Sequence, residues 1–147
     1  MGFFKSLFGI GNNSNQILSI HDDEFGNLTA IKNPGKKVIW RSSANFLGYP
    51  VEIYIPGDTE KLSQNEKVSI QEILKNQSPI ETEINRSLKE LYDNAGKTYQ
   101  NWSQHFNLIS ITATATHPII TLEERDSFYE FTIFFTDSKA TGVSIDS

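Results

Sequence analysis

The hydrophobic period of this chain changes near residue 60, and that change constrains the fold more than any other feature. Residues 51–55 alternate apolar with polar side chains, which is the period of a strand with one buried face. From Ser63 onward apolar residues recur every three or four positions, which is the period of an amphipathic helix. Pro56-Gly57-Asp58 lies between the two patterns and ends the strand. The chain therefore combines a sheet with helices.

Two helices are predicted between residues 64 and 95. Ser63 with Glu66 three residues later is a capping-box pattern, and the apolar spacing that follows predicts a helix over about residues 64–76. Ser78-Pro79, with Glu81 completing a second capping box, predicts another helix over about 79–95. Its apolar stripe comprises Ile80, Ile84, Leu88, Leu91 and Tyr92 and stops before Gly96. The short connection favours a helical hairpin, or one broken helix, against the sheet.

Strand patterns lie on both sides of the helices. Before them come residues 16–21, 28–31 after a Gly26-Asn27 turn, a strand beginning at Val38, and 51–55; after them come 107–116, 119–122, 128–135 and 142–145. This segregated order predicts an α+β fold, a mostly antiparallel sheet with the two helices packed on one face. The length of 147 residues predicts one domain, over residues 16–147.

Residues 1–15 form an apolar N-terminal arm. On a helix, Phe3, Phe4, Leu7 and Phe8 share one face, opposite Lys5 and Ser6. Such an arm can dock on its own core, remain disordered, or contact a membrane or a partner through residues 1–11. The four apolar residues are the candidate membrane-contact residues, and they support an alternative function as a peripheral membrane protein.

Composition excludes several classes of protein. The chain has no cysteine, which excludes disulfide scaffolds, thiolate zinc sites and cysteine catalysis. The net charge of −5 argues against binding nucleic acid. No apolar run is long enough for a membrane-spanning helix, so a cytoplasmic location is expected.

Catalytic and cofactor motifs are absent from the sequence. His21-Asp22-Asp23-Glu24 is the densest set of potential metal ligands, but consecutive strand residues point to opposite faces, and a polar turn is the simpler interpretation. There is no Gly-x-Ser-x-Gly elbow and no phosphate-binding glycine loop. We therefore expect no enzyme activity, no metal and no cofactor. An enzyme of unfamiliar type is a third possibility.

Acidic and aromatic residues near the C-terminus are the candidate binding residues. Residues 105–147 carry six acidic and two basic side chains, which suits a basic partner. Glu123, Glu124 and Asp126 form an acidic run that is either a solvated hairpin tip or a docking patch. Tyr99 and Trp102 lie in the polar stretch 97–104, outside the periodic elements, and are the better aromatic interface candidates. The predicted partner-binding residues are Tyr99, Trp102, Glu123, Glu124 and Asp126.

One further pattern extends over much of the chain. The order Asp23-x-Phe25-Gly26-x-Leu28, then Trp40, then residues 51–58, then a helical Gln64 to Asn76 resembles small bacterial proteins grouped as domain of unknown function 2004. The similarity covers about residues 17–95, and residues 131–145 look like its closing strands. The resemblance implies an α+β, non-enzymatic bacterial protein, and similar domains occur among predicted immunity proteins encoded beside polymorphic toxins. A protein that binds and neutralises a toxin is thus the concrete form of the predicted interaction function.

Overall fold

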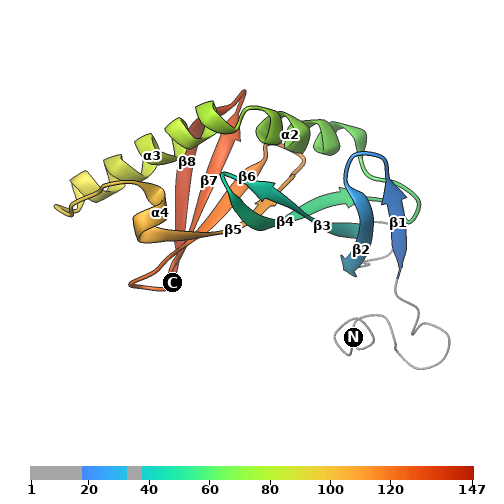
Figure 1. Ribbon diagram of the computed structural model, residues 1–147, viewed down its shortest axis with the longest axis horizontal. Coiled ribbons are helices and arrows are strands. Elements are labelled where there is room, and N and C mark those ends of the chain that lie inside the picture. The colour runs from blue at the N-terminus through green and yellow to red at the C-terminus, as the bar shows by residue number, and fades with distance from the viewer. Residues whose placement is uncertain (1–17, 33–37) are drawn as a thin grey trace.

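The computed structural model describes residues 18–32 and 38–147, which form an eight-stranded sheet with two long helices along one side (Figure 1). The first four strands are β1 (Ser19–Asp22), β2 (Gly26–Lys32), β3 (Val38–Phe46) and β4 (Tyr49–Gly57). The helices α2 (Gln64–Lys75), α3 (Gln77–Asn94) and the short α4 (Trp102–His105) follow. The chain ends with β5 (Phe106–Thr112), β6 (Ile119–Glu124), β7 (Glu130–Thr136) and β8 (Lys139–Asp146). The predicted α+β class is confirmed.

The strands lie in the sheet in the order of the sequence, and only one adjacent pair is parallel. Neighbours from β1 to β4 and from β5 to β8 are antiparallel, whereas β4 and β5 run parallel with Ile53 opposite Ile111. A parallel pair requires a crossover connection, which the three helices provide. The sheet is thus two antiparallel halves joined at one parallel seam, β4–β5.

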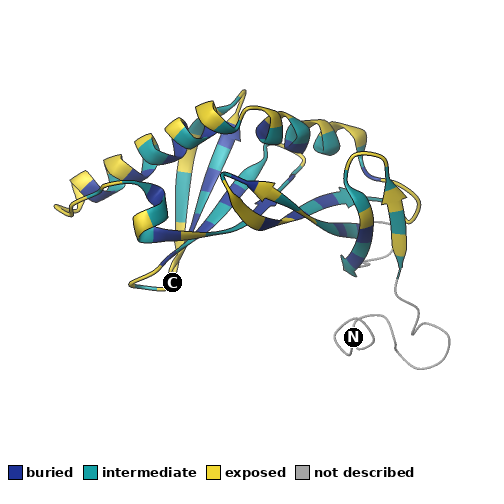
Figure 2. Cartoon of the chain, in the orientation of Figure 1, coloured by how far each residue is buried: buried dark blue, intermediate teal, exposed yellow. Residues whose placement is uncertain are grey.

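The core lies between the helices and the sheet face they cover. Helix α2 buries Ile70 and Ile73 and helix α3 buries Ile80, Ile84 and Leu88, so both long helices turn one stripe inward (Figure 2). On the sheet side, the fully buried residues include Trp40, Phe46, Ile53, Ile55, Phe106, Ile111, Ile133 and Phe135. Alternation along each strand leaves polar side chains on the opposite face.

The helix ends agree with the predictions at some positions and differ at others. Ser63 is the N-cap of α2, but its side chain makes no capping hydrogen bond. The prediction that Ser78 is the N-cap of this helix is wrong, because α3 begins at Gln77. The amide of Ile80 donates a hydrogen bond to the Asn76 carbonyl at 3.1 Å. The predicted end of α3 before Gly96 is confirmed: Gly96 has φ 69°, and its amide bonds the Asp93 carbonyl.

Four loops differ from the sequence prediction. A strand was predicted over 107–116, but β5 ends at Thr112 and residues 113–118 form a loop. The first hairpin turns at residues 23–25, so Gly26 belongs to β2. Strand β7 begins at Glu130, because the amide of Phe128 bonds the Glu124 carbonyl at 2.8 Å in a turn that holds Phe128 outside the strand. The polar stretch 97–104 contains most of α4, whose N-cap Asn101 accepts a hydrogen bond from the Gln104 amide.

Candidate interaction surface

One end of the sheet gathers residues from both halves of the chain. Strands β4 and β5 run parallel, so both begin at this end. Each later strand is antiparallel to the one before it, so β6 ends here, β7 begins here and β8 ends here. Tyr49 starts β4, residues 125–129 form the β6–β7 turn, and Ile145 lies near the end of β8. We refer to these residues, together with Glu123, Glu130 and Asp146, as the docking end.

The docking end carries most of the exposed large apolar side chains. Among the described residues, the exposed large hydrophobics are Phe128 (72 % exposed), Ile145 (47 %), Tyr49 (46 %), Tyr129 (43 %) and Val68 (39 %). All except Val68 belong to the docking end. Aromatic residues are enriched where proteins bind one another, because they bury a large area at low cost in side-chain entropy.

Three carboxylates stand directly opposite one another on neighbouring strands of this end. Glu123 of β6 pairs in register with Glu130 of β7, and Glu130 pairs with Asp146 of β8. Residues in register point to the same face of a sheet, with Cβ atoms about 5 Å apart. Like charges in such positions repel, so this acidic row places negative potential on the uncovered face of the sheet. Tyr49 and Ile145 lie in register with the buried Phe46 and Phe131, so their side chains belong to the helix-covered face at the same end of the sheet.

A small apolar cavity opens beside Tyr49. It has a volume of about 220 Å³, and Pro50, Trp102, Phe106 and Leu108 form its apolar lining. The ring of Tyr49 packs edge-on against Trp102 at a centroid distance of 5.4 Å. At its polar rim, Nε of Arg125 donates a hydrogen bond to Oδ1 of Asn107 at 3.1 Å. The cavity is large enough for one apolar side chain of a partner.

A buried polar cluster around Glu124 connects the β6–β7 turn of the docking end to α3. The hydroxyl of Tyr92 in α3 donates a hydrogen bond to Oε2 of Glu124, and Ser127 Oγ donates one to Oε1 at 2.6 Å. Lys97 Nζ lies 3.5 Å from Oε2 of Glu124 and 4.7 Å from the centre of the Tyr92 ring. Burial alone would raise the pKa of Glu124, but the hydrogen bonds from Ser127 and Tyr92 and the charge of Lys97 lower it below its ordinary value. Glu124 is thus a charged anchor for the β6–β7 turn.

The segment before β5 is held by a second set of contacts. Asn85 of α3 accepts hydrogen bonds from the Tyr99 hydroxyl and from the Trp102 amide, the latter at 2.8 Å. The indole Nε1 of Trp102 donates to Oε2 of Glu81 at 2.8 Å. Burial, with the nearby charge of Glu81, raises the pKa of Tyr99. These contacts fix α4 against α3 and so position Trp102 under Tyr49.

The predicted partner-binding residues occupy two layers. Asp126 is exposed and Glu123 is half-buried, and both belong to the docking end. Trp102 and Glu124 are only 3 % and 5 % exposed and lie beneath the surface, whereas Tyr99 is half-buried. As a partner-binding set the five residues stay a prediction. The predicted membrane-contact residues Phe3, Phe4, Leu7 and Phe8 lie outside the described residues, as does the arm 1–15.

Several residues of the docking end were missed in the sequence. Phe128 and Tyr129 look like the start of an aromatic strand, but two adjacent aromatic residues cannot both face one core in a strand. That conflict, next to the turn residues Asp126-Ser127, was the available signal. No local sequence pattern predicts that Glu130 pairs with Asp146, because the register of two strands depends on the whole hairpin.

Two ionisable groups elsewhere, Tyr54 and Glu83, have shifted pKa values. Burial and a 2.6 Å hydrogen bond to Glu52 raise the pKa of Tyr54 to about 12. The pKa of Glu83 is lowered, chiefly by its hydrogen bond from Arg86. A general acid or base needs a pKa near the working pH, so these shifts move both groups away from such chemistry.

The His21–Glu24 cluster forms a polar turn. His21 bonds Asn27 at 3.0 Å, and Asp22 bonds Lys67 at 2.8 Å and two backbone amides at 2.9 and 3.1 Å. Within residues 18–32 and 38–147, no group of three His, Asp or Glu side chains is placed to hold a metal ion. None of the described helices has both the length and the apolar character needed to cross a bilayer.

No family model, curated protein or solved structure matches this chain. The resemblance to the domain of unknown function 2004 group therefore stays a prediction. The functional interpretation depends on the geometry of the docking end.

Proposed function

We propose that this chain is a non-enzymatic binding protein whose protein partner contacts the docking end. The observation that carries the proposal is the coincidence, at one end of the sheet, of exposed aromatic residues and a carboxylate row. Aromatic anchors supply most of the affinity in protein interfaces, whereas complementary charge supplies specificity and a fast association rate. The partner surface is accordingly basic and carries an apolar side chain that fits the cavity beside Tyr49.

The acidic row supports a basic partner for an energetic reason. Opposed carboxylates on adjacent strands destabilise the free protein by a few tenths to about 1 kcal/mol for each pair. Arg or Lys side chains of a partner would convert that repulsion into attraction. Phe128 adds a second cost, since its backbone has φ 63° although the residue is not glycine. Both costs are explicable if these residues are used in binding.

An immunity-type role in the bacterial cytoplasm is the concrete form of the proposal. An immunity protein neutralises a toxin by covering a surface that the toxin needs, which requires anchors and charge complementarity but no catalytic group. The docking end supplies those elements. The family resemblance in residues 17–95 and 131–145 points to the same role.

Affinity capture with matched charge variants tests this function. Tagged full-length protein is compared with Glu130→Lys/Asp146→Lys, which reverses two charges of the acidic row, and with Asp23→Lys/Glu24→Lys, which makes the same charge change in the β1–β2 turn. All four of these residues are exposed. We expect one stoichiometric protein partner, identified by mass spectrometry, whose affinity falls at least about tenfold in the first variant only. Equal loss in both variants would show that only net charge matters, and would overturn the proposal.

A copy lacking residues 1–12 separates this function from membrane association. A partner retained by the shortened copy supports binding through the docking end. Capture of lipid vesicles that disappears with the arm, and without a protein partner, would instead support the peripheral membrane alternative.

A further inference from the structure

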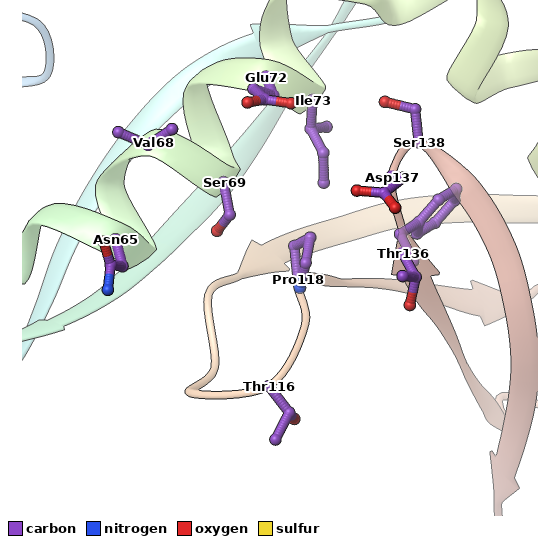
Figure 3. A pocket seen from close by; sticks show the side chains of 11 residues that line it. Asn65, Val68, Ser69, Glu72, Ile73, Thr116, Pro118, Thr136, Asp137 and Ser138 are labelled. Atoms are coloured by element: carbon purple, nitrogen blue, oxygen red, sulfur yellow. The ribbon is translucent and has the colours of Figure 1, made fainter.

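Strand β8 is the outer strand at one edge of the sheet. It follows the two-residue turn Asp137-Ser138, which Figure 3 shows from close by, near Ile73 of α2. From Lys139 to Asp146 the strand pairs with β7 alone, so its other side has no neighbouring strand among the described residues. Such an edge presents backbone N–H and C=O groups that another strand can bind.

The backbone groups of alternate residues of β8 point toward this edge. In β7, the amide of Phe135 donates a hydrogen bond to the carbonyl of Pro118, which precedes β6. Phe135 and the residues two and four positions before it therefore turn their backbone groups away from β8. Their partners in β8 are Ala140, Val143 and Ile145. Both members of a non-hydrogen-bonded pair face outward, so these three residues direct their N–H and C=O groups to the edge.

Helix α3 closes the first of these positions and leaves the other two open. The amide of Ala140 donates to Oε1 of Glu83 at 3.0 Å, and Nη2 of Arg86 donates to the Ala140 carbonyl at 3.0 Å. Within the described chain, the outward groups of Val143 and Ile145 bind no other backbone or side-chain atom. Each of these two residues thus offers one donor and one acceptor to a further strand.

The open part of the edge lacks the residues that usually protect an edge strand. Proteins block free edges with lysine, with other charged side chains or with proline. None of these residues occurs from Gly142 to Ile145. Ile145 is 47 % exposed although it lies in register with the buried Phe131, so an apolar side chain on the helix-covered face contacts water. This composition suits pairing with another strand.

A hollow beside the edge has room for an apolar side chain. It lies between α3 and β8, has a volume of about 200 Å³, and includes Leu91, Ala140 and Val143 in its lining. Val143 pairs with the buried Ile133, so it lies on the same face of the sheet as Ile145. A residue placed opposite Val143 in an added strand would share that face and lie next to the hollow.

We propose that two copies of this chain associate through β8, antiparallel and with Ser144 opposite Ser144, so that their sheets become one. About this two-fold axis, Val143 of each copy lies opposite Ile145 of the other, and the open N–H and C=O groups of both residues are paired. Each exposed Ile145 is covered by Val143 of the second copy and lies at its hollow between α3 and β8. The register leaves the contacts of Ala140 with α3 intact.

The charges at the two ends of β8 favour a second copy as the occupant of this edge. In the proposed register Asp146 lies opposite Gly142 of the other copy, which has no side chain. Lys139 of that copy lies one diagonal position away, past the bulge at Thr141. Diagonal neighbours are about 7–8 Å apart, within reach of a long side chain. The Lys139 side chain is 75 % exposed, with Nζ 4.0 Å from Oε2 of Glu83, so it has room to turn toward Asp146.

Sedimentation equilibrium of the purified full-length protein tests the proposal. The apparent mass should rise with concentration from that of one chain toward that of two. Val143→Pro removes an amide that faces the second copy, and the β7–β8 pairing does not use that amide. We expect this variant to associate at least about tenfold more weakly. Unchanged association of Val143→Pro would overturn the proposal. A single-chain mass at every concentration would also overturn it and leave the edge to a strand of a different protein.

Charge variants test the register and control for folding. Lys139→Asp and Asp146→Lys each place like charges at both ends of the paired strands, so each alone should associate at least about tenfold more weakly than the unchanged protein. An equal mixture of the two variants should regain association, because every such pair then joins Asp with Lys. Recovery in the mixture cannot come from repair of a misfolded chain, since the chains are the same.

Lys61→Asp is the matched control for net charge. It makes the same change as Lys139→Asp at an exposed position before α2, in the other half of the sheet, and should associate like the unchanged protein. Equal loss in Lys61→Asp, or a mixture of the two charge variants that does not recover, would contradict the proposed pairing.

The dimer goes beyond the proposed function, and it is measured without any other protein. It covers Ile145 and Asp146 of the docking end, whereas Tyr49 and Phe128 belong to β4 and to the β6–β7 turn, outside the paired strand. Lys139→Asp alters the dimer but no residue of the docking end. Affinity capture with this variant therefore separates the two proposals: a dimer without a captured partner refutes only the binding function, and a captured partner without a dimer refutes only the dimer.

Discussion

The hydroxyl of Tyr92 donates a hydrogen bond to Oε2 of Glu124, and this contact ties α3 to the end of β6. Tyr92 is 5 % exposed and Glu124 is also 5 % exposed, so the bond is closed to solvent. Glu124 is followed directly by the β6–β7 turn, which carries Asp126 and Phe128. The orientation of the docking end therefore depends on a contact in the core.

Tyr92→Phe should destabilise the fold by about 1.5–3 kcal/mol. The substitution removes a hydrogen bond to a buried charged group without leaving a large cavity. Tyr54→Phe is the matched control, because the Tyr54 hydroxyl also bonds a glutamate, but Glu52 is exposed and water can replace the bond. We expect that control to lose less than about 1 kcal/mol. Urea unfolding measures both, and equal losses would refute a special role for Glu124.

Acid should weaken the fold partly through Glu124. Because the pKa of Glu124 is lowered in the folded state, the unfolded chain takes up the proton at a higher pH. The contribution of Glu124 to stability is thus complete above the ordinary glutamate pKa of 4.5 and is lost as the pH falls through the folded-state pKa. The free energy of unfolding should decline from about pH 5 downward, and less steeply in Tyr92→Phe. An identical decline in the two proteins would show that Tyr92 does not stabilise the carboxylate.

Phe128→Gly should weaken partner binding without destabilising the protein. Phe128 is 72 % exposed and has positive φ, so glycine relieves a steric cost of about 1–2 kcal/mol, while its greater backbone entropy costs about 0.5–1 kcal/mol. The thermal midpoint should stay the same or rise. A clear fall in the midpoint would show that the Phe128 ring contributes to folding.

Trp102→Ala should strongly destabilise the fold, and weaker partner binding in this variant would follow from that loss rather than from a lost direct contact. The side chain is 3 % exposed, and its loss would leave a cavity and an unpaired Glu81 carboxylate, at a cost of about 3–5 kcal/mol. Trp102→Phe loses less, because most of the packing is retained. Near-ultraviolet circular dichroism and urea unfolding distinguish these outcomes. A Trp102→Ala protein with unchanged stability and weakened binding would instead place Trp102 in the interface itself.

The sequence predicted elements whose signals are local. Residues 51–55 and the stripe from Ile80 to Tyr92 have strong periods. The structure confirms the strand at 51–55 and the helix predicted over about 79–95, each within two residues at both ends. Gly96 marked the helix end because its positive φ is readily available only to glycine.

Features that depend on distant residues could not be predicted in the same way. The burial of Trp102 follows from Asn85 and Glu81, which lie in another helix and bind its amide and indole. The acidic row follows from the register of two hairpins. The parallel pairing of β4 with β5 depends on where the intervening helices return the chain, for which the strand pattern holds no signal.

The β4–β5 seam also determines at which stage of folding the docking end is assembled. Each half of the sheet is built from neighbouring hairpins, whose pairing closes short loops, whereas the seam closes a loop of roughly 50 residues between Gly57 and Phe106. Closing such a loop costs roughly 3 kcal/mol of chain entropy, so the seam is expected to form late in folding. Tyr49 belongs to the first half, and Arg125 and Phe128 belong to the second. A partner that contacts all three thereby recognises only chains that have completed folding, and partly folded chains with free strand edges are left unbound.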